Sequence, residues 1–213
     1  MAKLIVFEGI DRSGKSTQIE RLYNYLTKLG QRVLKTREPW VESTRELLKN
    51  TELKSEHQLA IIQEDRYKHC CYLKENLDKY DVIICDRFTP STLAYQGYGL
   101  GLDLNTIHDV NKRATQGLKP DLILLIDCPV RVAIKRSEKP LDAIEKNILF
   151  LEIVRMGYLS LASKYDYKMI DGSRPADRVF IDVFDEVNAL FYDSVFKGNE
   201  FNDLLKLATT NLK

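Results

Sequence analysis

Long apolar runs, an excess of one charge and paired cysteine motifs are all missing from this chain of 213 residues. No stretch has the apolar length of a membrane-spanning helix and no signal-peptide pattern opens the chain, so we expect a cytoplasmic protein without a membrane partner. The 32 basic and 31 acidic residues nearly cancel, and this balance gives no sign of the broad basic surface of a nucleic-acid-binding protein. Any preference for an anionic ligand must therefore come from local sites.

Cysteine is scarce and follows no paired pattern. The four cysteines are Cys70, Cys71, Cys85 and Cys128, and no two of them have the C-x-x-C spacing of a metal or redox motif. Cys70 and Cys71 are adjacent, which makes them poor disulfide partners. We therefore expect four reduced thiols that are buried as small residues, as is usual in the cytosol.

The chain does contain a regular alternation of apolar strand-like runs with helix-like segments. The runs are rich in Val, Ile and Leu without polar alternation, which is typical of parallel strands covered on both faces. Strands that alternate with helices indicate a doubly wound α/β fold, here one domain over residues 1–213. We expect strands at 3–8, 32–36, 81–86, 121–127 and 168–171, and helices at about 15–29, 43–49, 56–78, 130–136 and 175–192.

The stretch FEGIDRSGKST, residues 7–17, lies between the first expected strand and the first expected helix. From Gly9 to Ser16 it reads G-x-x-x-x-G-K-S, the pattern of a loop whose backbone N–H groups surround phosphate oxygens. Lys15 is expected to reach the β- and γ-phosphates of a nucleoside triphosphate, and the Ser16 hydroxyl to bind Mg²⁺. A GTPase switch is disfavoured, because NKRA at 111–114 lacks the aspartate of a guanine-binding N-K-x-D motif.

Three arginines are expected on the side of the sheet where the strands end and where ligands of α/β folds gather. Arg37 comes just after the second strand, Arg66 lies in a helix, and Arg87 follows Asp86 at the end of the third strand. A planar guanidinium pairs bidentately with phosphate oxygens. A second phosphate site facing the glycine loop predicts phosphoryl transfer to an acceptor that itself carries a phosphate.

The segment ICDRFTPSTLAYQG (84–97) resembles the most specific segment of the thymidylate kinase family, and TREP, DRYKH and GLKPDLILLID (117–127) follow in similar positions. The resemblance covers about residues 3–190. It implies a P-loop kinase fold with a five-stranded parallel sheet, helices on both faces and a lid at about 137–147. It also implies transfer of the γ-phosphate of ATP to dTMP, with Mg²⁺, giving dTDP and ADP, in a homodimer. The role of the polar tail at about 196–213 stays open.

On the donor side, the resemblance implies that the glycine loop and one later arginine bind ATP. Arg136 would lie against the adenine, and Asp86 would lie near Mg²⁺ through water while Ser16 binds the ion. The catalytic residues implied are Arg12, Lys15 and Asp86. The whole ATP-binding set is Gly9, Ile10, Asp11, Arg12, Ser13, Gly14, Lys15, Ser16, Thr17 and Arg136.

On the acceptor side, the resemblance implies that Arg37 and Arg87 hold the phosphate of the deoxynucleoside monophosphate. Arg66 would hydrogen-bond the thymine edge, and Asp11 would contact the sugar 3′-hydroxyl or the metal shell. Tyr95 would close the space beside the sugar 2′ carbon and so disfavour ribonucleotides. The whole acceptor-binding set is Asp11, Arg37, Ile62, Arg66, Arg87, Thr92, Tyr95 and Gln96.

Phosphoryl transfer needs positive charge where charge develops on the moving group. Thymidylate kinases resemble one another in having an arginine there, which some carry in the phosphate loop and others in the lid. The expected lid, SEKPLDAIEKN at 137–147, contains no arginine, and DAIE at 142–145 replaces the D-R-I-E of lid-type members. We therefore expect Arg12 to be the catalytic arginine, with a solvent-facing or salt-bridged Arg12 as the alternative. Lys139 of the lid is a weaker candidate.

Two positions depart from the family pattern. Ile62 stands where the family usually has an aromatic ring that stacks on thymine, which predicts a broadened acceptor range that includes dUMP or another 5-substituted deoxyuridylate. Trp40 stands where many members have glycine. It either covers the base or packs under the loop, and the sequence does not choose between these two places.

No general base is assigned, because the attacking oxygen belongs to a phosphate that is ionised at neutral pH. We therefore interpret His57, His69 and His108 as surface or packing residues. Two other functions stay open at this point. One is a kinase for a different nucleoside monophosphate or for a deoxynucleoside, and the other is a nucleotide-binding protein without catalysis, which the intact phosphate loop disfavours.

Overall fold

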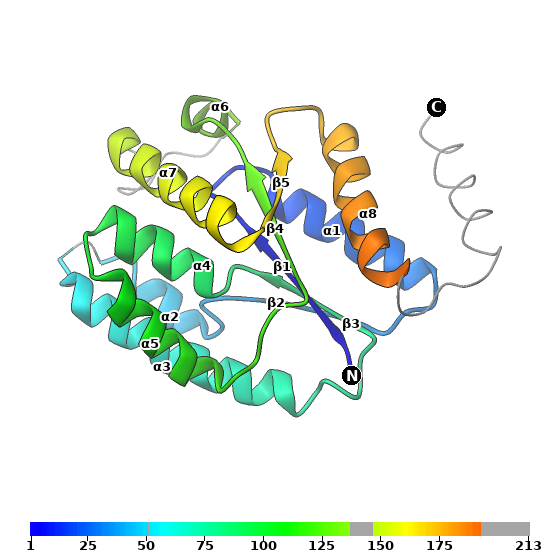
Figure 1. The fold of residues 1–213 in the computed structure, drawn as a ribbon, viewed down its shortest axis with the longest axis horizontal. Helices are drawn as coiled ribbons and strands as arrows, with labels where there is room; N and C mark the ends of the chain where they lie inside the picture. Colours follow the sequence, from blue (N-terminus) through cyan, green and yellow to red (C-terminus); the bar gives the residue numbers. More distant parts are fainter. Residues whose placement is uncertain (51, 137–146, 193–213) are drawn as a thin grey trace.

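The computed structural model describes residues 1–50, 52–136 and 147–192. Within these ranges five parallel strands form one sheet in the order β2-β3-β1-β4-β5 (Figure 1). The predicted α/β fold with a five-stranded parallel sheet is therefore confirmed. The expected lid, apart from Asn147, lies outside the described residues, as do Lys139 and the tail at 196–213. The strands are β1(Lys3–Glu8), β2(Val33–Arg37), β3(Val82–Asp86), β4(Leu122–Asp127) and β5(Lys168–Asp171).

The strands form where successive apolar residues are buried alternately on opposite faces of the sheet. Ile5 and Ile84 belong to the core on one face, whereas Leu4, Val6 and Ile83 belong to the core on the other. This alternation is the two-residue repeat of a strand, and both sets are apolar because both faces are covered.

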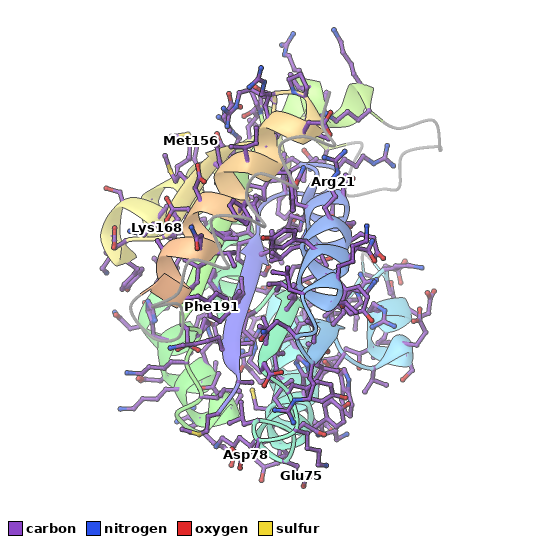
Figure 2. All side chains as sticks on the ribbon, turned by 90° about the vertical axis from the view of Figure 1, so that its right-hand side faces the viewer. Arg21, Glu75, Asp78, Met156, Lys168 and Phe191 are labelled. Atoms are coloured by element: carbon purple, nitrogen blue, oxygen red, sulfur yellow. The ribbon has the colours of Figure 1, made fainter. Side chains whose placement is uncertain are left out.

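Helices cover both faces of the sheet (Figure 1). On one face, α1(Lys15–Lys28) and α8(Ala176–Tyr192) bury Leu22 and Val183 in the core that they share with the strands. Figure 2 shows the side chains of this layer, with Phe191 near the end of α8. The remaining helical segments are α2(Glu42–Leu47), α3(Ser55–Lys74), α4(Thr89–Thr92), the π-helical η1(Leu93–Gly99), α5(Leu104–Thr115), α6(Val130–Lys135) and α7(Ile148–Tyr165).

The strand register brings chemistry-bearing residues to one edge of the sheet. Phe7 of β1 pairs with Asp86 of β3, which in turn pairs with Arg37 of β2. On the other side, Asp127 of β4 pairs with Asp171 of β5. All of these strands run in the same direction, so their carboxyl ends converge on the crevice where ligands of such sheets bind.

The structure differs from the sequence prediction mainly in its helices. Strand β2 ends at Arg37 rather than at residue 36, so that this arginine is part of the strand. Helix α3 ends at Lys74 rather than near residue 78. The segment α4–η1 and the whole of α7 were not predicted. Helix α7 is apolar on most sides, with exposed Leu149 and Met156 as well as buried residues, so it lacks the one-sided pattern of a surface helix.

Two expectations from composition can be compared directly with the structure. No helix in the described part of the chain is long and apolar enough to cross a membrane. All four cysteines are free, and three of them are buried. The three buried thiols thus behave as the small core residues that the sequence suggested, whereas the expected burial is wrong for Cys71, which is only partly buried.

Candidate active site

The glycine loop joins the end of β1 to the start of α1. Gly9 and Gly14 have φ angles of 136° and 109°, and Arg12 at the tip of the loop has a φ angle of 63°. A Cβ atom on Gly9 would lie 2.5 Å from the carbonyl oxygen of Ile126, so only glycine fits there. The loop thus leads into the positive end of α1, where free backbone N–H groups favour phosphate.

Lys15 is the first residue of α1 and is buried beneath the loop. Its Nζ donates to the carbonyl oxygens of Gly9 and Ile10, at 2.9 Å each. Burial, together with the positive charge of Arg87, lowers the pKa of Lys15 to about 8, although Asp86 and Asp11 act in the opposite direction. The ammonium is therefore held in place but lacks a full counter-charge, which suits a group that binds phosphate.

A cavity of about 630 Å³ opens next to the loop, within the size range of small-ligand sites. Its wall comes from the loop, the end of β2, α3, the α4–η1 segment and the start of α7. All eight predicted acceptor residues lie in this wall. The lining residues are Asp11, Arg37, Glu38, Pro39, Arg45, Leu48, Lys49, Asn50, Gln58, Ile62, Arg66, Arg87, Phe88, Ser91, Thr92, Tyr95, Gln96, Leu100, Asn147 and Phe150.

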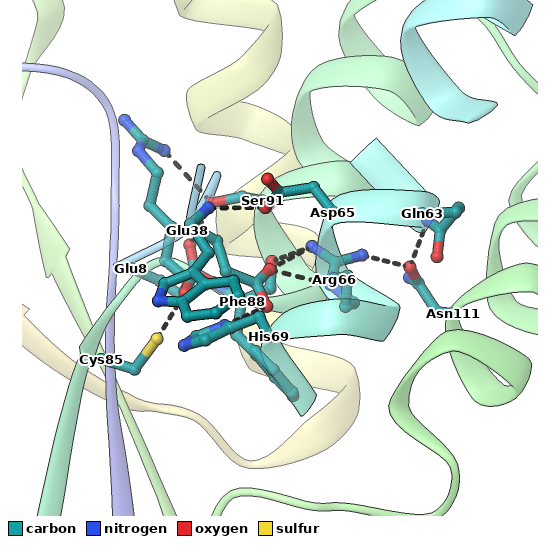
Figure 3. A network of polar contacts seen from close by, with 12 residues as sticks. Glu8, Glu38, Gln63, Asp65, Arg66, His69, Cys85, Phe88, Ser91 and Asn111 are labelled. Atoms are coloured by element: carbon teal, nitrogen blue, oxygen red, sulfur yellow. Dashed lines mark hydrogen bonds and ion pairs between the residues drawn. The ribbon is translucent and has the colours of Figure 1, made fainter. Parts of the chain in front are cut away.

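Arg66 is held in this wall by a buried ion pair with Glu38 (Figure 3). Its Nε donates to Glu38 Oε2 at 2.8 Å, and its Nη2 donates to the carbonyl oxygen of Phe88 at 3.1 Å. Nη1 donates to Asn111 Oδ1. Burial by itself raises the pKa of Glu38, but Arg66 and His69 together hold it below its ordinary value. Arg66 is thus part of the scaffold as well as of the cavity surface.

The network extends to two further residues that the sequence left undecided. His69 is fully buried, with Nδ1 at 3.0 Å from Glu38 Oε1 and Nε2 at 2.9 Å from Thr36 Oγ1. The ring of Trp40 stacks on His69 and Tyr72, with centroid distances of 5.7 and 5.1 Å. Trp40 is not part of the described cavity lining. Of its two expected places, the structure therefore shows the one under the loop.

Arg87 connects the cavity to the glycine loop. Its Nη2 donates to Asp11 Oδ1 at 2.8 Å and to the hydroxyl of Tyr95 at 3.3 Å. Burial by itself raises the pKa of Asp11, but the charges of Arg87 and Lys15 lower it to about 2, so Asp11 is ionised at neutral pH. The Tyr95 hydroxyl also donates to Asp11 Oδ2 at 3.2 Å. This ion pair brings a residue of the glycine loop and an arginine of the cavity wall into direct contact.

The other expected donor-site residues surround the loop. Arg136 Nη1 donates to the carbonyl oxygen of Ser13 at 3.1 Å, which places this arginine on the loop. Ser16 and Thr17 are exposed in the first turn of α1. Arg37 is exposed at the end of β2 and lines the cavity next to the end of β3, where its strand partner is Asp86.

The residues available for a metal ion are few but suitable. Oδ1 of Asp86 is buried and has no hydrogen-bond partner among the residues that the structure describes. In the same residues, no group of three His, Cys, Asp or Glu side chains could hold a metal ion. One carboxylate and the Ser16 hydroxyl fit Mg²⁺, which commonly binds to one or two protein oxygens together with water and substrate phosphates.

Sequence reasoning missed three buried residues of this site. Glu8 is the last residue of β1, Glu38 directly follows β2, and each lies next to a predicted functional residue; this position at a strand end was the available signal. The third is Tyr158 of α7, whose hydroxyl accepts a hydrogen bond from Arg87 Nη1 at 3.0 Å. No signal could have found Tyr158, because the helix that carries it was not predicted.

Comparison with known proteins now decides the family. A family model described as thymidylate kinase matches residues 7–183. The chain belongs to the thymidylate kinase family. A thymidylate kinase of Geotalea daltonii is 37% identical over 203 residues, covering 86% of this chain and 95% of the relative. A thymidylate kinase of Sulfurihydrogenibium sp. is 40% identical over 184 residues, covering 81% of this chain and 90% of the relative.

The fold agrees with that of a solved thymidylate kinase. The crystal structure of thymidylate kinase from Ehrlichia chaffeensis matches with a TM-score of 0.73 and 30% sequence identity, covering 87% of this chain and 98% of the solved one. As a thymidylate kinase, the chain is an enzyme of the phosphotransferase class. The glycine loop and the arginine-lined cavity are the parts of the structure that this class requires.

The buried ion pair of Arg66 yields a stability prediction. Arg66→Met leaves the carboxylate of Glu38 buried without its main partner, which typically costs about 3–5 kcal/mol of unfolding free energy. Arg32→Met is the matched control, since Arg32 pairs with Asp81 on the surface and such pairs contribute about 1 kcal/mol or less. Urea unfolding of both variants measures the difference, and equal losses would contradict the scaffold role of Arg66.

The lowered pKa of Lys15 yields a prediction about proton uptake. At pH 8 about half of the free enzyme carries a neutral Lys15, and the phosphates of ATP, the donor of the family, favour the charged form. ATP binding at pH 8 should therefore take up roughly half a proton. Calorimetry in two buffers of different ionisation enthalpy measures this uptake, which should disappear in Lys15→Arg. Equal uptake in both proteins would show that another group is responsible.

Proposed function

We propose how this chain carries out the reaction of its family, the transfer of the γ-phosphate of ATP to dTMP with formation of dTDP and ADP. The observation that supports the arrangement best is the contact at 2.8 Å between Asp11 of the glycine loop and Arg87 of the cavity. The contact supports an arrangement in which a triphosphate bound on the loop would lie next to a monophosphate bound in the cavity. Because the two reactants then meet at one point, positioning supplies a large part of the rate.

The donor half consists of the loop and the first turn of α1. Lys15 binds the β- and γ-phosphates, the backbone of residues 9–17 surrounds them, and Arg136 lies against the adenine. Ser16 and Asp86 hold Mg²⁺, which neutralises phosphate charge when bound. The unpartnered buried oxygen of Asp86 supports this role, because a buried carboxylate oxygen needs either a hydrogen bond or a cation.

The acceptor half is the cavity. Arg37 and Arg87, at the neighbouring ends of β2 and β3, bind the phosphate, and Asp11 and Tyr95 contact the sugar. Four donor contacts of Arg66 go to Glu38, Asn111 and Phe88, which leaves one N–H of Nη1 for the thymine edge. The base-contacting residues proposed are Ile62, Arg66, Thr92 and Gln96, all of which lie in the cavity wall.

The catalytic charge comes from Arg12 at the tip of the loop. Its position beside the phosphate-binding N–H groups supports this role, as does the absence of arginine from the sequence 137–147. No histidine is required as a base. His69 is engaged with Glu38, His108 Nε2 lies 3.0 Å from the hydroxyl of Tyr165, and His57 is exposed on α3.

Three further properties belong to the same proposal. The family resemblance supports a homodimer, and helices α3 and α5 offer surfaces for it. The free state of all four cysteines suits the reducing conditions of the cytoplasm. Residues 1–213 form one kinase domain, which is supported by relatives that match this chain over 95% of their own length.

The first test concerns Arg12. Arg12→Ala should lower kcat for dTMP by about 10³–10⁵-fold, because the developing charge loses its partner, while the Kd of ATP changes little. Arg32→Ala, at the surface ion pair with Asp81, serves as the control for loss of one arginine. Activity should be measured on a panel of deoxy- and ribonucleoside monophosphates. An unchanged kcat in Arg12→Ala would refute the role of Arg12, and preference for another monophosphate would redefine the acceptor.

The second test concerns the base. Ile62 contributes an apolar wall in place of a stacking ring, so the wild type should discriminate less between dTMP and dUMP than an Ile62→Phe variant does. Base stacking contributes about 1–3 kcal/mol, so a severalfold to roughly hundredfold difference in kcat/KM is expected. Equal discrimination by the two proteins would count against a broadened acceptor range.

A further inference from the structure

Behind Arg87 lies a buried carboxylate that has no place in the reaction described above. Glu8, the last residue of β1, is completely buried. Its Oε1 accepts the backbone N–H of Phe88 at 2.7 Å. Its Oε2 accepts from the hydroxyl of Ser91 at 2.6 Å and from the hydroxyl of Tyr158 at 2.9 Å. Three parts of the chain, the α4 segment, α7 and β1, thus meet at one carboxylate.

The two hydroxyls connect Glu8 to Arg87. Each hydroxyl has one hydrogen, and with that hydrogen directed at Glu8 its oxygen lone pairs are free to accept. Nη1 of Arg87 donates to Ser91 Oγ at 3.2 Å and to the hydroxyl of Tyr158 at 3.0 Å. Nη1 has two N–H groups, one for each oxygen. The carboxylate therefore sets the direction of both hydroxyls, and these fix the plane of the guanidinium.

The same carboxylate also fixes the backbone. Arg87 has a φ angle of 74°, in the left-handed region that residues with a side chain rarely adopt. The backbone N–H of Arg87 donates to the carbonyl oxygen of Phe7 at 2.9 Å, and the next N–H, of Phe88, donates to Glu8. Neighbouring residues of β1 thus hold the turn that aims Arg87 at the loop.

We propose that Glu8 and Tyr158 are positioning residues that set the affinity for the acceptor's phosphate through Arg87. Neither residue belongs to the described cavity lining, so they act on the substrate only through the arginine that they hold. The inference rests on the proposed function of the cavity. The inference goes beyond that function because it assigns two buried residues to phosphate recognition.

The test separates the phosphate's contribution to binding from that of the nucleoside. Calorimetry without ATP gives the Kd of dTMP and the Kd of thymidine. The Kd of thymidine divided by the Kd of dTMP reports how much the phosphate adds to binding. Tyr158→Phe removes one hydroxyl without changing the ring, and should reduce this ratio about tenfold while thymidine binding stays the same. Tyr98→Phe is the matched control, because its hydroxyl lies 2.9 Å from Ser160 Oγ, away from Arg87; it should leave the ratio unchanged.

A double-mutant cycle distinguishes positioning from a merely structural role. In an Arg87→Met background, Tyr158→Phe should change the Kd of dTMP less than about twofold. An effect that persists in that background, or an equal loss for dTMP and thymidine, would overturn the inference. Glu8→Gln, with folding checked by Tm, should follow the pattern of Tyr158→Phe. Failure of the wild type to bind dTMP at all would instead overturn the proposed function, and this inference with it.

Discussion

The ion pair between Arg87 and Asp11 is the interaction on which the rest of the site depends. It joins the loop that follows β1 to the turn that follows β3, and so connects the glycine loop to the wall of the cavity. Asp11 stays half exposed, whereas Arg87 is largely covered. The arginine is therefore anchored from the protein side, and the aspartate is the partner that a ligand can reach.

Several buried charged groups lie at this edge of the sheet. Glu8, Glu38 and Arg66 are nearly inaccessible to solvent; Glu38 and Arg66 compensate each other's charge, whereas burial raises the pKa of Glu8 despite its hydrogen-bond donors. Breaking such a pair is costly because one charge is then left in a low-dielectric interior. Lys15 differs, since burial disfavours its charge more than the nearby carboxylates favour it, and it is therefore ready for a phosphate.

Much of this arrangement was predictable from local pattern. The five strands and the glycine loop follow from unbroken apolar runs and from one spaced motif, and the arginines at strand ends follow from the rule that such ends converge. Helix α7 was missed because it is apolar on most sides, and Tyr158 was missed with it. Arg66 was predicted as a ligand-binding residue, but its buried pairing with Glu38 links residues 28 positions apart and has no local signal.

The sequence by itself determined the order of the five strands along the chain, the glycine loop that follows the first of them, and the family. These depend on residue type and spacing over short stretches, where backbone preference and burial act directly. Only the tertiary structure decided that Trp40 packs on His69 and Tyr72, that the eight residues predicted to bind the acceptor line one cavity, and that Glu8 lies behind Arg87. Such contacts arise when strands pair and helices cover them, so no single segment contains the information.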